Sequence, residues 1–227
     1  MTAPWLPAGR RVGLCFHGIG RRQRELESEE ERYWISRDQF LSILDELSGW
    51  PAVDISFDDG NASDVEIALP ALQERGLSGT FYALAGRLDQ PGSLYAEDLR
   101  TLAMAGMEIG THGWNHVPWT GLDAPAFRHE ISQARSCLAE LVGRPVTKAA
   151  LPLGRYDRRV LRGLRKEAYE RVSTSDRALA RGGAWLSPRF SVRATDSPES
   201  MRQIVSAAAR SRARVLTSAK GAVKRHR

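Results

Sequence analysis

Short runs of β-forming residues alternate with segments of helical periodicity along almost the whole chain. Eight such runs occur, at residues 12–16, 53–57, 79–84, 107–111, 147–151, 170–174, 190–194 and 214–217. Alternation of this kind is typical of parallel strands covered by helices. No linker rich in Pro, Gly or Ser divides the 227 residues. The pattern therefore favours one closed or nearly closed α/β barrel over two small domains.

The segments between the runs carry signals for helix ends. A capping box, Ser36-x-x-Gln39, precedes apolar residues at helical spacing, and a second, Ser63-x-x-Glu66, opens a segment that reaches Gly76 with Pro70 as a kink. A third helix is predicted over residues 123–142, opened by Asp123 and closed by Gly143. We expect these amphipathic helices to pack outside the strands.

The positive charge is concentrated at the carboxyl terminus. The chain has 33 basic and 27 acidic residues, a net charge of +6, but residues 210–227 hold seven basic residues and no acidic one. The remaining residues carry −1, which argues against a nucleic-acid-binding protein. The basic tail favours solubility, with weak contact to a membrane surface as the alternative.

The composition also indicates the cellular compartment of the protein. No apolar run approaches the roughly 18 residues of a membrane span, and the amino terminus lacks the basic and apolar regions of a signal peptide. Cys15 and Cys137 lie far apart, on a predicted strand and a predicted helix, which favours two buried thiols in a reducing compartment over a disulfide. The sequence thus predicts a soluble, cytoplasmic protein.

Polar residues follow four of the predicted strands. They are His17 after the first run, Asp58-Asp59-Gly60 after the second, Thr111-His112 after the fourth, and Pro152-Leu153-Gly154 after the fifth. In a parallel barrel the carboxyl ends of the strands meet at one rim, where active sites are built. We expect these residues to converge there.

The residue types at these positions suit metal-dependent hydrolysis. His112 and His116 are four residues apart, a spacing that puts both rings on one face of a helical turn. Two histidines and a carboxylate, with one position left open, form a hydrolytic zinc arrangement. Two adjacent carboxylates do not both ionise freely, so one of Asp58 and Asp59 can bind the metal while the other acts as a base. Ordinary surface histidines and a plain Asp-Asp-Gly turn are the simpler alternatives.

Three motifs resemble those of a known family. SFDDG (56–60), THGWNH (111–116) and LPLG (151–154), in this order, are similar to the first three motifs of the polysaccharide deacetylases, the NodB-homology or carbohydrate esterase 4 group. The resemblance covers residues 12–217 and leaves residues 1–11 as an extension and 218–227 as a basic tail. It implies a distorted (β/α)7-8 barrel in a single domain. It also implies a metal-dependent hydrolase that removes an N-acetyl group from an N-acetylated sugar, a glycan or a lipid-linked saccharide.

The resemblance assigns roles residue by residue. The first aspartate of the motif, Asp58, is the general base, and Asp59, His112 and His116 hold a divalent metal, with Zn²⁺ expected. The backbone N–H of Leu153 stabilises the oxyanion. Weaker candidates for contact with the sugar are Trp114, Trp119, Tyr156, Arg155 and Asp176.

Two features of the family are missing. Its third motif often carries an arginine that orients the base, but Ala150 stands at that position, and Lys148 and Arg155 are the candidates to replace it. Its late general-acid histidine is also absent, because the corresponding strand reads ARVLTS.

LCFHGIG (14–20) resembles the amino-terminal segment of the poly-N-acetylglucosamine deacetylase branch, in which the first strand supplies the acid. His17 is therefore the predicted general acid, at the barrel rim on the side of the metal away from Asp58. A histidine with a purely structural role is the alternative reading.

Two alternative functions remain open. Fold does not fix substrate, so a hydrolase of a small non-sugar amide fits the same residues. A carbohydrate-binding relative with weak or no catalysis is the second alternative, and retention of Asp58, Asp59, His112 and His116 argues against it.

Overall fold

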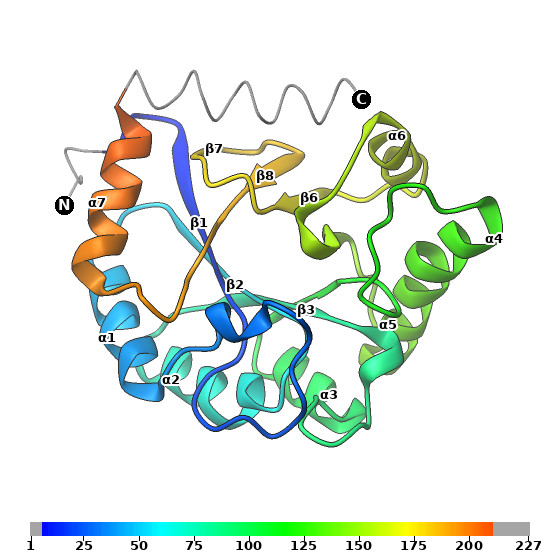
Figure 1. The fold of residues 1–227 in the computed structure, drawn as a ribbon, viewed down its shortest axis with the longest axis horizontal. Coiled ribbons are helices and arrows are strands. Elements are labelled where there is room, and N and C mark those ends of the chain that lie inside the picture. The colour runs from blue at the N-terminus through cyan, green and yellow to red at the C-terminus, as the bar shows by residue number, and fades with distance from the viewer. Residues whose placement is uncertain (1–5, 211–227) are drawn as a thin grey trace.

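The computed structural model describes residues 6–210, and its strands form one nearly closed barrel (Figure 1). Neighbouring parallel strands follow the order β1 (Arg10–Phe16), β2 (Val53–Asp58), β3 (Gly79–Ala83), β4 (Glu108–Thr111), β5 (Lys148–Ala150), β6 (Arg171–Thr174) and β8 (Leu186–Pro188). The chain then passes through Arg189 to β9 (Phe190–Ser191), which pairs in parallel with β1. The short strand β7 (Ala180–Arg181) pairs with β1 in the antiparallel sense. The predicted α/β barrel is therefore confirmed, and β8 and β9 close it.

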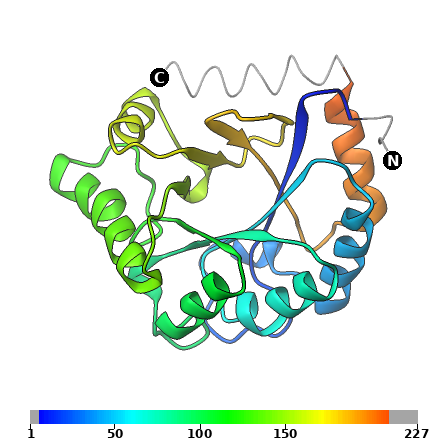
Figure 2. The same ribbon diagram turned by 180° about the vertical axis from the view of Figure 1, so that it is seen from behind.

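Helices lie outside the barrel on most of its sides (Figures 1 and 2). The α-helices are α1 (Arg37–Ser48), α2 (Leu69–Glu74), α3 (Ala96–Met104), α4 (Ala124–Phe127), α5 (Ala134–Val142), α6 (Arg158–Lys166) and α7 (Pro198–Ala209). Two π-helical segments, Asp64–Ala68 and Arg128–Gln133, precede α2 and α5. Short 3-10 helices lie at Glu30–Tyr33, Ala85–Arg87 and Pro152–Gly154. None of the helices within residues 6–210 is long and apolar enough to cross a membrane.

The apolar core lies between the strands and the helices. Outward-facing strand residues such as Leu14, Phe16 and Phe57 are fully buried against apolar side chains of α1, including Phe40. The rings of Phe16 and Phe40 meet edge to face with centroids 5.1 Å apart. A smaller cluster under α6 contains Trp119, Tyr156, Val160, Leu164 and Tyr169. Burial of these aromatic and aliphatic side chains is the main force that holds the helices to the sheet.

The inward-facing residues of the strands are small or polar. Gly13 of β1, Ser56 of β2, Tyr82 of β3 and Ser173 of β6 line a cavity inside the barrel. Most barrels of this kind fill the interior with branched apolar side chains. Here the interior is polar, and it leads towards the rim where the predicted site residues lie.

The helix ends agree with the sequence in two cases and disagree in one. Ser36 accepts a hydrogen bond from the amide of Gln39, and Asp123 accepts one from that of Ala126, as predicted. The predicted box at Ser36 is only half formed, because the Gln39 side chain donates to the carbonyls of Arg193 and Asp196. The predicted capping box at Ser63 is wrong, because the Ser63 hydroxyl accepts from the amide of Ile19, a residue just after β1. A tertiary contact to another segment has displaced the local cap.

The other predictions divide in a similar way. The helix over residues 123–142 is present and ends at Gly143 with φ 68°, but a π-helical segment interrupts it. Cys15 and Cys137 are free, as expected, but Cys15 is buried whereas Cys137 is only partly buried. The short strands β7 and β8 were not predicted. The predicted strand at 214–217 and the basic tail lie outside the described residues.

Candidate active site

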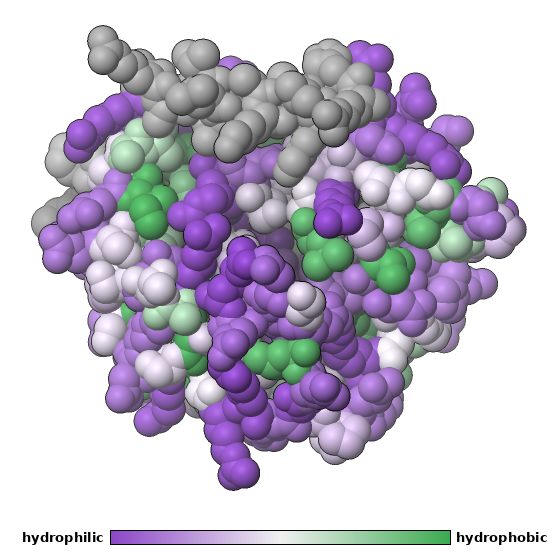
Figure 3. Space-filling model, in the orientation of Figure 1, coloured by the Kyte–Doolittle hydropathy of each residue, from purple (hydrophilic) through white to green (hydrophobic). Residues whose placement is uncertain are grey.

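A pocket of about 430 Å³ lies at the carboxyl ends of the strands. Hydrophilic side chains dominate the centre of this face of the molecule (Figure 3). The end of β2 and the loops after β1, β2, β4 and β5 all contribute to the pocket, through His17, Asp58, Asp59, His112, His116 and Leu153. The predicted convergence of these six residues is therefore observed. The lining also includes Glu27, Ser28, Glu29, Glu30, Arg32 and Tyr33, from a segment to which the sequence analysis gave no role.

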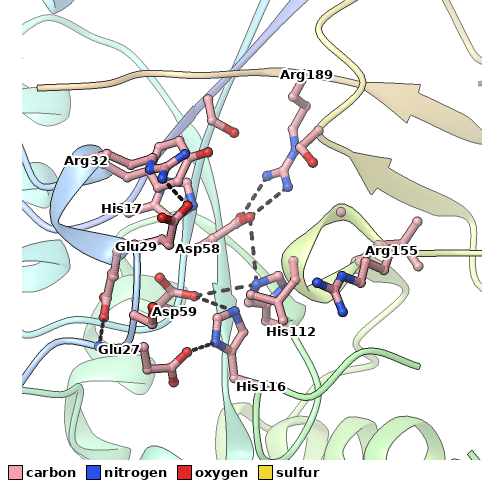
Figure 4. A pocket seen from close by; sticks show the side chains of 18 residues that line it. His17, Glu27, Glu29, Arg32, Asp58, Asp59, His112, His116, Arg155 and Arg189 are labelled. Carbon is pink, nitrogen blue, oxygen red and sulfur yellow. Dashed lines mark hydrogen bonds and ion pairs between the residues drawn. The ribbon is translucent and has the colours of Figure 1, made fainter. Parts of the chain in front are cut away.

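Asp59, His112 and His116 face one another across a short gap (Figure 4). Oδ1 of Asp59 lies 3.5 Å from Nε2 of His112 and 3.4 Å from Nε2 of His116. This oxygen is buried and, among the described residues, has no hydrogen-bond partner. A buried carboxylate oxygen in this state is costly unless a cation or a donor satisfies it. The three atoms thus form a donor set that a divalent metal fits.

The other nitrogen of each ring fixes which tautomer is present. Nδ1 of His112 lies 3.0 Å from the carbonyl oxygen of Ala150, and Nδ1 of His116 lies 2.6 Å from Oε2 of Glu27. Both acceptors require a proton on Nδ1, so in the neutral form of each ring the lone pair is on Nε2. Burial also lowers the pKa of His112 to about 4, so the ring is neutral at pH 7. Neutral imidazoles with free Nε2 lone pairs are the form that binds metal.

The loop from His112 to His116 is not the helical turn that the spacing predicted. Its backbone has positive φ at Gly113 (97°) and at His116 (57°). The buried carboxylate of Glu130 accepts hydrogen bonds from the amides of Trp114 and Asn115 and from the Asn115 side chain. These bonds satisfy the loop donors without a helix, and the π-helical segment brings Glu130 into position.

Asp58 is held by an arginine that the sequence analysis missed. Nη1 and Nη2 of Arg189 each donate to one oxygen of the Asp58 carboxylate, both over 2.8 Å. Burial disfavours the charged form of Asp58, but Arg189 and then His112 outweigh it and keep the pKa of Asp58 below its usual value. Asp58 is therefore ionised and fixed in orientation.

Neither candidate for the missing arginine contacts Asp58. Lys148 lies 3.3 Å from Glu108 at the amino end of the strands, and Arg155 is exposed at the edge of the pocket. Arg189 is 131 residues from Asp58 and lies between two short strands, so no local motif marks it. The glycine at position 13 is the one indirect sign of this arginine in the sequence, because a Cβ there would lie 2.9 Å from Cγ of Arg189. Gly13 leaves room for this side chain.

His17 lines the same pocket, half-buried, and stacks on Tyr33 with ring centroids 4.9 Å apart. Its Nδ1 has no hydrogen-bond partner within residues 6–210. A ring nitrogen lies within 4.8 Å of both Sγ of Cys15 and a carboxylate oxygen of Asp58. The ring is at the rim as expected, but the expected position away from Asp58 is wrong. Because β1 and β2 are adjacent in the sheet, the residues at their ends are neighbours.

The five weaker candidates for sugar contact divide unevenly. Of that set, Arg155 is the one described residue that lines the pocket. Trp119 and Tyr156 are buried in the cluster under α6, and the Tyr156 hydroxyl donates to Asp176 over 2.6 Å. Trp114 packs on the ring of His129, with centroids 4.5 Å apart. These aromatic residues serve packing in this structure.

Fold and site together define a class of protein, a NodB-type barrel with two aspartates and two histidines gathered at its rim. The sequence profile of the family described as polysaccharide deacetylase matches residues 49–172. The chain therefore belongs to the polysaccharide deacetylase family.

Individual proteins are similar to this chain in sequence or in fold. YxkH of Bacillus subtilis (strain 168), provisionally described as a polysaccharide deacetylase, is 24% identical over 122 residues, which cover 54% of this chain and 44% of YxkH. The chain thus spans about half the length of that relative. Among solved structures, the deacetylase PplD of Streptococcus pyogenes matches with a TM-score of 0.74 and 18% identity, over 86% of this chain and 98% of PplD. IcaB from Ammonifex degensii matches with a TM-score of 0.70 and 24% identity, over 90% and 98%.

Proposed function

We propose that this chain is a metal-dependent hydrolase that removes the acetyl group from an N-acetylated sugar residue. One observation carries the proposal. Oδ1 of Asp59, which has no hydrogen-bond partner among the described residues, faces Nε2 of His112 and Nε2 of His116. The ionised carboxylate of Asp58 lies beside this group of atoms.

The residues have separate tasks in this reaction. Asp59, His112 and His116 would hold the metal, with zinc suited to one carboxylate and two imidazoles, and the metal when bound supplies Lewis-acid polarisation of the acetyl carbonyl. Asp58 accepts the proton of the attacking water, since Arg189 keeps it ionised and oriented. Glu27 fixes His116 through its hydrogen bond to Nδ1.

Two further groups act on the substrate side. Leu153 is 53% exposed, lines the pocket and has φ 54°, and we assign its backbone N–H to the tetrahedral oxyanion. His17 is the proton donor to the departing amine, supported by its place in the pocket and its unpartnered Nδ1. Arg155, at the pocket edge, is the candidate for contact with the rest of the sugar.

Metal analysis combined with acetate release tests the proposal. The purified protein is assayed for bound divalent metal and for acetate freed from N-acetylglucosamine, its oligomers, lipid-linked N-acetyl sugars and small non-sugar amides. We expect about one metal per chain and release from sugars that chelation abolishes. If acetate is released only from small amides, the substrate is a non-sugar amide and not an N-acetylated sugar. Turnover without metal would refute the proposal.

A further inference from the structure

A second cavity, of about 190 Å³, lies inside the barrel at the amino ends of the strands. The first residues of several strands form its mouth, including Arg11, Asp54, Glu108, Lys148 and Arg171. It lies behind the candidate active site, and Arg189 is the one described residue that lines both cavities.

The charges at this cavity do not balance. Arg11 holds Asp54 with two hydrogen bonds, of 2.8 and 2.6 Å, and Lys148 lies 3.3 Å from Glu108. Arg171 shares Asp54 at a longer distance of 3.6 Å. Since Arg189 is neutralised by Asp58, three cations meet two carboxylates, and one positive charge is left over.

The inner wall offers hydrogen-bond donors. Ser173 and Ser187 line the cavity, and the Tyr82 hydroxyl lies 2.9 Å from Oγ of Ser173. The hydroxyl of Ser56, also in the lining, already donates to the carbonyl oxygen of Leu14. Arg189 is 4% exposed, and its Nε has no hydrogen-bond partner in the part of the chain that the structure describes. Its side-chain stem lies against Gly13, which also lines the cavity, while its tip points to Asp58 (Figure 4). A buried guanidinium N–H without an acceptor is costly and therefore points to a ligand.

We propose that this inner cavity binds one small monovalent anion of the carboxylate class, with acetate as the representative. One surplus positive charge, serine hydroxyls and the free Nε–H of Arg189 suit a single carboxylate. At about 30 Å³ per water, the volume has room for a two-carbon acid and a few waters, but not for a glycan. The choice of acetate rests on the proposed function, of which acetate is the product, whereas the anion site does not depend on it. Because Arg189 would contact both the anion and Asp58, the site couples product level to the orientation of the base.

Acetate binding to the chelator-treated protein tests the inference without requiring activity. Calorimetric titration compares acetate with acetamide, its neutral analogue, in the parent and in two variants that each lose one guanidinium. Arg171→Gln changes the inner cavity, and Arg155→Gln changes the pocket at the other end of the barrel. We expect acetate but not acetamide to bind, with affinity about tenfold weaker in Arg171→Gln and unchanged in Arg155→Gln.

The opposite pattern, with binding lost in Arg155→Gln and kept in Arg171→Gln, would place acetate in the outer pocket and overturn the inference. Equal binding of acetamide, or no binding of acetate, would also overturn it. Bromide soaked into crystals of the parent protein gives a check that needs no variant. An anomalous peak between Arg171 and Arg189 supports the site, and bromide elsewhere alone refutes it. A protein that binds the anion but releases no acetate from sugars would refute the proposed function and leave this site standing.

Discussion

Asp58 and Asp59 are neighbours with opposite surroundings. The backbone turns into the left-handed region at Asp59, with φ 79°, so the two side chains meet different partners. Asp58 faces the Arg189 guanidinium, and Asp59 faces two imidazoles. We therefore predict that Asp58→Asn abolishes acetate release while metal content stays near one per chain. Asp59→Asn should instead lower metal content, as measured by atomic emission after dialysis. Equal loss of metal in both variants would refute the division of roles.

His17 gives a second prediction. A positioned proton donor contributes a factor of roughly 10²–10⁴, so His17→Gln should slow kcat by that amount and leave metal binding unchanged. A substrate whose leaving group needs no proton should recover much of the loss. If His17→Gln instead lowers the free energy of unfolding and leaves kcat unchanged, the residue has a structural role.

The burial of Asp64 leads to a prediction of how the free energy of unfolding changes with pH. It is fully buried, and neither carboxylate oxygen has a hydrogen-bond partner among the described residues. Burial, then Asp59 and Asp58, raise the pKa of Asp64 well above its usual value. The folded form keeps a proton that the unfolded form releases above about pH 4, so this group contributes stability at low pH that is lost as pH rises.

Asp64→Asn should therefore become more stable relative to the parent between pH 4 and pH 7. Urea unfolding at both pH values, in the presence of a chelator, measures the difference. Asp38→Asn, at an exposed position in α1, is the control and should show little change. A difference between Asp64→Asn and the parent that is the same at both pH values contradicts the prediction.

The π-helical segment Arg128–Gln133 determines the shape of the loop that carries both histidines. Its Glu130 accepts bonds from two backbone amides and one side chain, a task that needs both carboxylate oxygens. Glu130→Gln would replace one acceptor by an NH₂ group and leave loop donors unpaired, at a cost of about 1–3 kcal/mol.

We predict that Glu130→Gln keeps the fold but binds zinc more weakly than the parent, measured by competition with a chelating dye. Glu140→Gln, at an exposed position in α5, should bind as the parent does. Unchanged zinc affinity in Glu130→Gln would show that the loop is held in another way.

A metal at the rim would connect distant parts of the whole molecule. Its ligands follow β2 and β4, and Glu27 ties His116 to the segment before α1. A ligand that binds the folded chain at 100 times its dissociation constant stabilises it by about 2.7 kcal/mol. We predict that a chelator lowers the melting temperature of the parent but not of Asp59→Asn, measured by differential scanning calorimetry. An equal shift in both proteins would mean that the metal binds elsewhere.

The sequence by itself determined the architecture and which residues lie at the rim of the barrel. Apolar strand runs that end in Asp58-Asp59, His112 or Leu153 predicted convergence, because parallel strands put their carboxyl ends at one edge. Periodicity and caps located the main helices, since these signals depend on residues a few positions apart. The motifs around Asp58 and His112 also identified the family.

Only the tertiary structure decided what surrounds those residues. Arg189 reaches Asp58 across 131 residues and Glu27 reaches His116 across 89, distances over which a sequence carries no local signal of contact. The segment after His112 is a loop and not the expected helical turn, because the Glu130 carboxylate accepts hydrogen bonds from the amides of Trp114 and Asn115. The polar lumen follows from which face of each strand turns inward. That choice depends on closure by β8 and β9, a non-local pairing that no short segment specifies.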